Sequence, residues 1–168
     1  MITFEQLNAQ NDRITELTNV LSTLLSDRFL CDSSITCDLF YQYVDEVKKH
    51  LEITDRKLYT PLLTSGDSHA MTVANRFMGG SKEIKRIFAA FLKKWCDQKH
   101  KSLKVANFDE FSEATDEMFS MVLDRIQDEV EHLYPLLREV RGDSLARCLT
   151  SFHYSATKNG SRWLPFFW

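Results

Sequence analysis

Four stretches of the sequence carry apolar side chains at alternating steps of three and four residues, and polar residues interrupt each series near its middle. The series are Leu7, Asn11, Ile14, Thr18, Leu21, Leu25; Tyr43, Val47, His50, Thr54, Leu58; Phe77, Ser81, Ile84, Phe88, Phe91, Trp95; and Met118, Val122, Arg125, Glu129, His132, Leu136. Such steps place side chains on one face of an α-helix. Because an inward-facing polar group costs free energy unless it finds a partner, the interrupted positions are the first candidates for a functional site or its remains.

The composition is that of an ordinary soluble globular domain. Hydrophobic residues make up 43% of the 168 residues and charged residues 27%, and a chain of this length can bury a core without disulfide staples. The formal net charge of −3 lacks the basic excess of a general nucleic-acid binder, so no nucleic-acid partner is expected. Only three prolines and five glycines occur, which favours long helices.

The cysteines and the first residues bear on the expected location. Cys31, Cys37, Cys96 and Cys148 form neither a CxxC pair nor a zinc-finger spacing, so we expect reduced thiols. The opening MITFEQLNAQ lacks a basic region followed by an apolar run. No apolar stretch approaches the roughly 20 residues that span a bilayer. A cytoplasmic protein without a transmembrane segment is therefore expected.

Capping signals delimit four long helices. Thr3 with Gln6, and Asn107 with Glu110, have capping-box spacing. The predicted helices cover about residues 3–27, 37–58, 69–101 and 107–139, with Pro61 beyond the second and Gly79-Gly80 interrupting the third. No stretch shows strand alternation. The sequence predicts an all-α fold, an up-down-up-down four-helix bundle.

The chain divides into a bundle over residues 1–140 and a C-terminal tail over residues 141–168. The tail is basic, has no acidic residue after Asp143 and ends in WLPFFW. Three alternatives remain open: packing across the bundle, contact with a partner or membrane surface, or a poorly ordered extension. Packing on the bundle is the default, because an exposed apolar cluster of this size favours association.

The two halves of the bundle repeat each other. HLEITDRKLYTPLL from His50 matches RIQDEVEHLYPLL from Arg125, and NDRITEL from Asn11 matches SKEIKRI from Ser81, at similar separations. Two helical hairpins related by a pseudo-two-fold axis would explain the repeat. The four interrupted faces would then meet at one level of the core.

With these motifs the sequence resembles the hemerythrin-like family, the HHE cation-binding domains. In that family each half supplies a histidine from its first helix, and a histidine and a glutamate four residues later from its second helix, ahead of a motif like LFPLL. The resemblance covers about residues 3–138. It implies a di-iron centre in the bundle core that binds oxygen, nitric oxide or iron.

Most of the ligands that the resemblance implies are replaced in this sequence. Asn11 and Ser81 occupy the positions of the first-helix histidines, and Thr54 occupies that of one glutamate. Arg125 stands in place of the last histidine, and a guanidinium neither ligates a cation nor tolerates one nearby. Only two of the six positions keep a ligand type, and these remnant metal positions are His50 and Glu129.

Two interpretations of the remaining polar residues compete. In the first, Arg125 and Glu129 form an ion pair one helical turn apart, and a polar core layer of Asn11, Thr54, Ser81 and Arg125 hydrogen-bonds around it. In the second, a shifted metal site uses His132, Glu129 and His50. The first interpretation is preferred, with no cofactor expected; iron is the alternative cofactor.

No nucleophile–base pair, phosphate loop or pair of catalytic carboxylates stands out, so the protein is not expected to be an enzyme. The preferred function is a non-enzymatic interaction or regulatory module with an eroded di-iron site and a protein partner that the sequence does not identify. The alternative is an iron-binding HHE protein that senses or stores iron, oxygen or nitric oxide at a reduced site. The sequence does not predict an oligomeric state.

Overall fold

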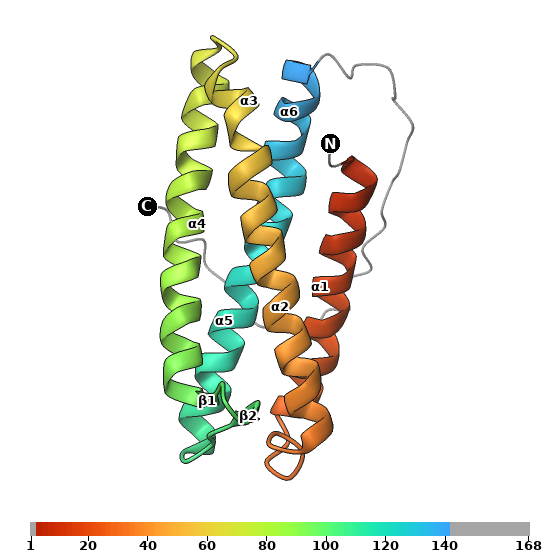
Figure 1. Cartoon of the computed structure of the whole chain (residues 1–168), viewed down its shortest axis with the longest axis vertical. Coiled ribbons are helices and arrows are strands. Elements are labelled where there is room, and N and C mark those ends of the chain that lie inside the picture. The colour runs from red at the N-terminus through yellow and green to blue at the C-terminus, as the bar shows by residue number, and fades with distance from the viewer. Residues whose placement is uncertain (1–2, 142–168) are drawn as a thin grey trace, which may run out of the picture.

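The structure of the protein, a computed structural model, describes residues 3–141. Long helices run up, down, up and down, and short segments complete the first and second hairpins (Figure 1). The elements in chain order are α1 (Phe4–Leu25), α2 (Ser34–Lys57), α3 (Tyr59–Leu63), α4 (Ser68–Trp95), β1 (Cys96–Asp97), β2 (Ser102–Leu103), α5 (Phe108–Asp128), the π-helix η1 (Glu129–Leu133) and α6 (Tyr134–Arg141). The predicted all-α four-helix bundle is confirmed.

Side-chain caps begin each long helix. Thr3 and Gln6 form the predicted capping box of α1, and Asn107 accepts from the backbone N–H of Glu110 at the start of α5. Ser33 caps α2, which therefore begins three residues earlier than predicted, because the Ser33 hydroxyl accepts from the backbone N–H of Thr36. Asp67 caps α4.

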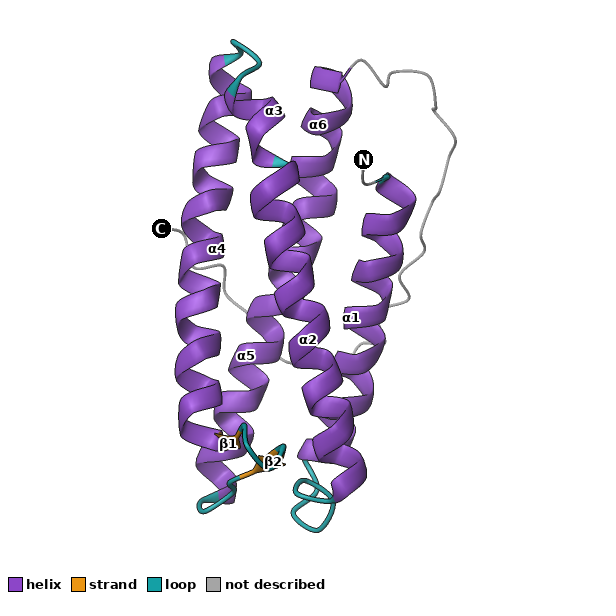
Figure 2. Ribbon diagram, viewed as in Figure 1, coloured by secondary structure: helices purple, strands orange, loops and turns teal. Residues whose placement is uncertain are grey.

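The third helix ends earlier than the sequence predicted. It passes without interruption through Gly79-Gly80 but stops at Trp95, where a two-stranded antiparallel hairpin pairs β1 with β2 (Figure 2). The Asp97 carboxylate accepts hydrogen bonds from the backbone N–H groups of Lys99 and His100. This local bonding offers the backbone a turn in place of further helix, so the predicted helix to residue 101 was wrong.

The LY segments of the repeat both mark a change of helix. The second predicted helix divides at Leu58 into α2 and α3, and Pro61 lies inside α3 rather than beyond the helical region. The fourth divides into α5, η1 and α6, with α6 beginning at Tyr134. In η1 the backbone N–H of Tyr134 donates to the carbonyl of Glu129, five residues back. Tyr59 and Tyr134 thus open equivalent segments in the two halves.

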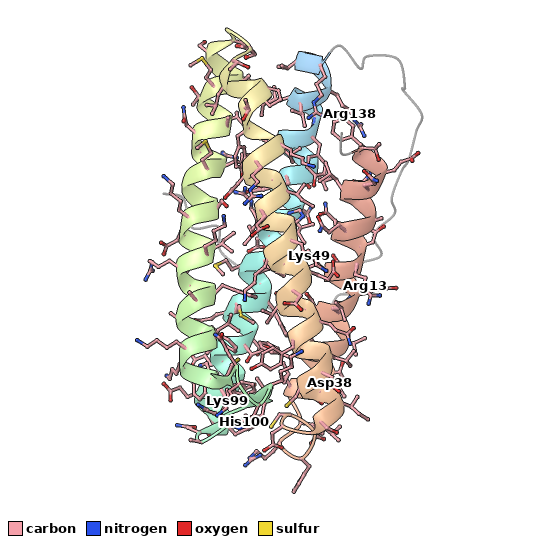
Figure 3. All side chains as sticks on the ribbon, viewed as in Figure 1. Arg13, Asp38, Lys49, Lys99, His100 and Arg138 are labelled. Carbon is pink, nitrogen blue, oxygen red and sulfur yellow. The ribbon has the colours of Figure 1, made fainter. Side chains whose placement is uncertain are left out.

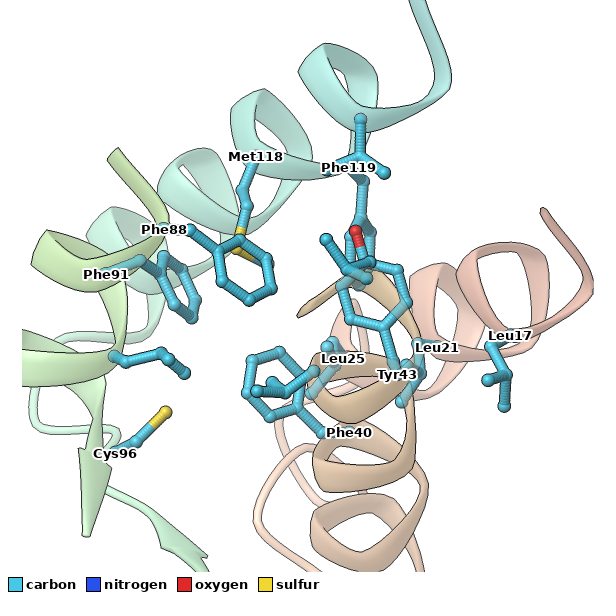
Figure 4. Close-up of a cluster of buried hydrophobic side chains, with 14 of the residues drawn as sticks. Leu17, Leu21, Leu25, Phe40, Tyr43, Phe88, Phe91, Cys96, Met118 and Phe119 are labelled. Carbon is cyan, nitrogen blue, oxygen red and sulfur yellow. The ribbon is translucent and has the colours of Figure 1, made fainter. Parts of the chain in front are cut away.

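The apolar core consists of two clusters. The larger one fills the end of the bundle near the β-hairpin, where rings and aliphatic side chains from α1, α2, α4 and α5 meet; Figure 4 labels among them Phe40, Tyr43, Phe88, Phe91, Met118 and Phe119. The smaller cluster fills the other end and includes Leu58, Tyr59, Leu62, Phe77, Leu133 and Leu137. The Phe-rich face of α4 belongs to the core.

Charged side chains lie on the outside of the bundle. The residues labelled in Figure 3, Arg13, Asp38, Lys49, Lys99, His100 and Arg138, are all exposed. None of the helices within residues 3–141 combines the length and the apolar character needed to cross a membrane.

Candidate functional site

Along each long helix, polar residues separate the two apolar clusters. Asn11 lies between Leu7 of the smaller cluster and Ile14 of the larger one, and Ser81 lies between Phe77 and Ile84 in the same way. His50 and Arg125 interrupt the apolar faces of α2 and α5. All the polar core positions predicted from the sequence are buried, with exposed fractions of 9% for Arg125 and 4% or less for the others. We call this set the polar layer: Asn11, His50, Thr54, Ser81, Arg125 and Glu129.

Glu129 is the centre of the polar layer. One of its carboxylate oxygens accepts from Arg125 Nε at 2.7 Å, which confirms the predicted ion pair. The other lies 2.8 Å from His50 Nε2 on α2. Because a carboxylate can only accept, Nε2 carries the proton in this contact. Both oxygens of a fully buried carboxylate are therefore bonded to side chains of the bundle itself.

The rest of the Arg125 guanidinium is also bonded inside the bundle. Nη1 donates to the backbone carbonyl of Phe77 at 3.1 Å, and Nη2 donates to the Tyr59 hydroxyl at 2.5 Å. The guanidinium carbon lies 4.5 Å from the centre of the Phe77 ring, within the range of a cation–π contact. Arg125 thus joins α5, α3, α4 and, through Glu129, α2.

Gly80 leaves the space that the guanidinium occupies. A Cβ at this position would lie 3.1 Å from Arg125 Nη1, closer than ordinary van der Waals contact, whereas a Cβ at the adjacent Gly79 would meet nothing within 4 Å. The predicted interruption at the glycine pair is absent, because α4 is continuous there. At Gly80 the missing side chain gives Arg125 access to the backbone of α4.

The α1 side of the polar layer is held by amides. The Asn11 amide nitrogen donates to the Tyr134 hydroxyl at 3.2 Å, while its buried Oδ1 has no hydrogen-bond partner among the described residues. Gln10 Oε1 lies 3.3 Å from His50 Nδ1. Thr54 does not join this side, because its hydroxyl donates to the backbone carbonyl of His50.

Ser81 is buried but points to a different partner. Its hydroxyl donates to the Asp55 carboxylate at 2.7 Å, and Lys85 forms an ion pair with the same carboxylate. Asp55 is partly exposed. The expectation that Ser81 belongs to the polar layer therefore holds for its burial, whereas its hydrogen bond leads outward to the edge of the bundle.

Two tyrosine hydroxyls complete the site. Burial raises the pKa of Tyr59, and the nearby Arg125 charge lowers it in part. Burial also raises the pKa of Tyr134, and the Glu129 charge raises it further. Both hydroxyls therefore stay protonated at neutral pH and serve as hydrogen-bonding groups rather than as bases.

The residues of the polar layer do not fit a di-iron centre. Asn11, Ser81, Thr54 and Arg125 hold four of the six positions that the resemblance assigns to ligands, and both Glu129 oxygens are bonded to the chain. A guanidinium at this position repels a metal cation. Within residues 3–141 no three His, Cys, Asp or Glu residues form a group that could hold a metal ion.

The shifted metal site considered from the sequence is not assembled. His132 is exposed on η1, whereas Glu129 and His50 are buried. The π-helical turn shifts the positions after Glu129 around the helix axis and leaves His132 on the outside. The prediction that His132 lies on the apolar face of the fourth helix was therefore wrong.

The remaining candidates are surface or core groups. His69 and His100 are exposed. Cys31, Cys37 and Cys96 are buried free thiols, and burial raises the pKa of each, to about 12 for Cys96. A raised pKa keeps these thiols protonated and unreactive. His153, Cys148 and the tail over 142–168 lie outside the described residues.

Sequence reasoning missed Gln10, Tyr59 and Tyr134 as members of the site. The two tyrosines could have been predicted, because they stand at equal offsets in the repeated LY segments. Gln10 carried no such signal, since it lies one position off the apolar face of α1. The carbonyl of Phe77 is a backbone group that no side-chain pattern reveals.

Comparisons of this chain with known protein families, with curated proteins and with solved structures give no match. The hemerythrin-like resemblance therefore stands on the motifs of the sequence.

Proposed function

We propose that this chain is a hemerythrin-like bundle in which an internal ion network has replaced the di-iron centre, and that it serves as a non-enzymatic interaction or regulatory module. The observation that carries the proposal is the bonding of Arg125. Its guanidinium bonds Glu129, Tyr59 and the Phe77 carbonyl in the middle of the bundle. A permanent cation with a hydrogen-bond partner on each of its three nitrogens supplies the positive charge that a metal would otherwise bring to Glu129.

The arrangement of the two halves supports the resemblance behind the proposal. Tyr59 and Tyr134 begin equivalent helical segments, and both place buried hydroxyls at the polar layer. The positions aligned by the repeat, His50 and Arg125, both bond Glu129. A bundle that keeps this architecture without the implied ligands can still bind a partner through its surface, which supports a non-enzymatic role.

Rebuilding the ligand set tests the proposal. The variant Asn11→His, Thr54→Glu, Ser81→His, Arg125→His would restore, with His50 and Glu129, all six ligand types that the resemblance implies. We expect the natural protein, produced with added iron, to contain no stoichiometric iron, and the rebuilt variant to bind iron and show iron–histidine or oxo-bridge absorption bands. The matched control carries the same changes together with His50→Ala.

Two results would contradict the proposal. About two irons per natural chain would favour the alternative of an iron-sensing or iron-storing protein. A rebuilt variant that folds and binds no more iron than its His50→Ala control would remove the hemerythrin-like interpretation. Circular dichroism of the metal-free variants separates a failure to fold from a failure to bind.

A further inference from the structure

A long groove runs along α5, on the face between α1 and α4. Its volume is about 1240 Å³, and its apolar lining includes Ile84, Phe108, Phe119, Met121 and Leu123. These side chains come from α4 and α5. Thr18, Asn19 and Ser22 of α1 form the opposite wall. The groove is distinct from the polar layer, which it touches only where Arg125 and Gly80 form part of its lining.

The groove is strongly acidic. Seven carboxylate residues line it: Glu83, Asp109, Glu113, Asp116, Glu117, Asp124 and Asp128. Arg125 is the single basic residue of the lining, and its guanidinium is already paired with Glu129. Of the seven, Glu83 alone has an ion-pair partner within residues 3–141, the neighbouring Arg86. The groove therefore presents apolar surface among six carboxylates that have no ion-pair partner in the described part of the chain.

The carboxylates repel one another along α5. Glu113 and Glu117, like Asp124 and Asp128, stand four residues apart, a spacing at which like charges destabilise a helix. Burial raises the pKa of the Asp124 carboxyl, and the Asp128 charge raises it further. A cationic group that enters the groove would reduce this repulsion.

The composition of residues 142–168 complements that of the groove. This segment holds the basic residues Arg147, Lys158 and Arg162, with Asp143 as its one acidic residue. Its aromatic residues are Phe152, Tyr154, Trp163, Phe166, Phe167 and Trp168. Basic and aromatic side chains together match an apolar floor with an acidic rim.

The length of the segment allows it to reach the groove. From Arg141 back to Asp128, at the near end of the groove, the helical path measures roughly 20 Å at about 1.5 Å per residue. The groove then follows α5 for roughly 30 Å more. Residues 142–168 span up to roughly 90 Å when fully extended, at about 3.3 Å per residue.

We propose that residues 142–168 of this chain bind in the acidic groove between α1, α4 and α5, with Arg147, Lys158 and Arg162 facing the carboxylates and the aromatic side chains on the apolar floor. The inference goes beyond the proposed function, because it names the surface and its occupant and does not depend on the loss of iron. Docking within one chain would cover the WLPFFW cluster and would also place basic side chains beside the carboxylates of α5. A partner that competes for the groove would release the segment.

Charge reversal on both sides tests the proposal in the full chain. The groove variant is Glu113→Lys, Asp116→Lys, Glu117→Lys, and the segment variant is Arg147→Glu, Lys158→Glu, Arg162→Glu. The readout is the rate at which chymotrypsin cleaves the aromatic residues of 142–168 under native conditions, followed by mass spectrometry. A synthetic peptide of residues 142–168 gives the unprotected rate. The matched control, Glu16→Lys, Asp45→Lys, Glu52→Lys, makes the same charge change at exposed sites outside the groove.

We expect cleavage in the natural chain to be slower than in the free peptide by roughly tenfold or more, a factor that corresponds to about 1.4 kcal/mol. The groove and segment variants should each lose this protection. The variant that combines all six reversals should regain it, and the control variant should keep it.

Natural-chain cleavage at the rate of the peptide would overturn the proposal, as would a control that loses protection equally or a combined variant that stays unprotected. Light scattering distinguishes the remaining case. A particle of two chains, with protection that falls on dilution, would assign the groove to the segment of a second copy instead. None of these results depends on iron content. The docking proposal can therefore fail while the proposed function holds, and the reverse is also possible.

Discussion

The guanidinium of Arg125 has donors on all three nitrogens, and each of them bonds a different acceptor in the core. Loss of only one partner in such an arrangement costs folding free energy. Removal of one member of a buried ion pair strands the other, whereas removal of both leaves an apolar space that neighbouring side chains fill. The stability of the polar layer therefore depends on Arg125 and Glu129 as a pair.

Truncation of Glu129 should be far more damaging than removal of the pair. We expect Glu129→Ala to lower the free energy of unfolding by roughly 3–5 kcal/mol, because it leaves the buried guanidinium without its counter-charge. The double variant Arg125→Leu, Glu129→Leu should recover much of this loss. Denaturant unfolding of both single variants and the double variant measures the coupling. Effects that simply add would mean that the two residues are not energetically paired.

The two glycines of α4 provide a matched pair of substitutions. Gly79→Ala should raise stability by roughly 0.5–1 kcal/mol, since alanine is the better helix former and nothing lies in its way. Gly80→Ala should gain less or lose stability, because its Cβ would meet Arg125 Nη1 at 3.1 Å. Thermal unfolding of the two variants compares them directly. Equal stabilisation at both positions would contradict the close approach of Arg125 to α4.

The buried tyrosine hydroxyls differ in what they bond. Tyr59→Phe removes the acceptor of Arg125 Nη2 and should cost about 1–3 kcal/mol, the penalty of a buried donor left unsatisfied. Tyr43→Phe should be neutral or stabilising, because the Tyr43 hydroxyl is buried without a hydrogen-bond partner among residues 3–141. Chemical denaturation of the two variants distinguishes them. Unchanged stability of Tyr59→Phe would show that the network around Arg125 does not need the Tyr59 hydroxyl.

The π-helical turn η1 adjusts the helical register between α5 and α6. It lies between Glu129, which must face the polar layer, and Leu133, which belongs to the smaller apolar cluster. A π-turn acts as one extra residue inserted into an α-helix, so the two flanking segments can each keep their own buried face. As a result, α6 buries Tyr134 and Leu137, as α3 buries the equivalent Tyr59 and Leu62.

Deletion of one residue tests the role of η1. Removing the exposed Val130 should convert the turn to regular α-helix with both flanking faces preserved, and should cost no more than about 2 kcal/mol. Removing the exposed Ser120 of α5 should abolish most of the stability of roughly 5–15 kcal/mol, because it rotates every later side chain by about 100°. Circular dichroism recorded during heating measures the thermal stability of both deletion variants. If the two deletions destabilise equally, η1 is not an accommodated insertion.

The sequence predicted most of the fold through its periodicity and its caps. The four apolar faces, the capping residues Thr3 and Asn107 and the Arg125–Glu129 pair were all recognisable, because each depends on spacing within one helix. The early end of α4 at Trp95 and the change at Glu129 were not predicted. Both depend on local hydrogen bonds of the backbone. These bonds can end or change a helix without altering the apolar periodicity of the sequence.

The partners across helices were harder to predict than the buried positions themselves. That Ser81 is buried follows from the pattern, but its bond to Asp55 of α2 depends on how two helices pack. The same applies to Gln10 beside His50. Periodicity assigns a side chain to a face, whereas the choice among several polar neighbours is fixed only by the distance and rotation between helices.

The buried tyrosines make the stability of the entire bundle sensitive to alkaline pH. Burial raises the pKa of Tyr41 to about 12 and raises the pKa values of Tyr43, Tyr59 and Tyr134 still further. Because the folded pKa values exceed the ordinary value of 10.0, the unfolded chain releases these protons first. The contribution to stability is therefore complete below the unfolded pKa and is lost as the pH rises through the folded values.

We expect the free energy of unfolding to be insensitive to these tyrosines below about pH 9 and to fall steadily above about pH 10. The ultraviolet absorbance of tyrosinate, recorded with circular dichroism, follows the process. Ionisation of the four described tyrosines should coincide with loss of helix. Reversible ionisation of all four near pH 10 in a helical protein would contradict their burial.

The proposed replacement of the metal by an ion pair has a consequence for how the protein matures. A metalloprotein whose folding is coupled to metal binding completes its core only when the metal binds. The quantity of folded protein therefore depends on the supply of that metal. Here the central cation is a side chain that the ribosome delivers with the rest of the chain. The quantity of folded protein should then remain constant when cells are starved of iron or flooded with it.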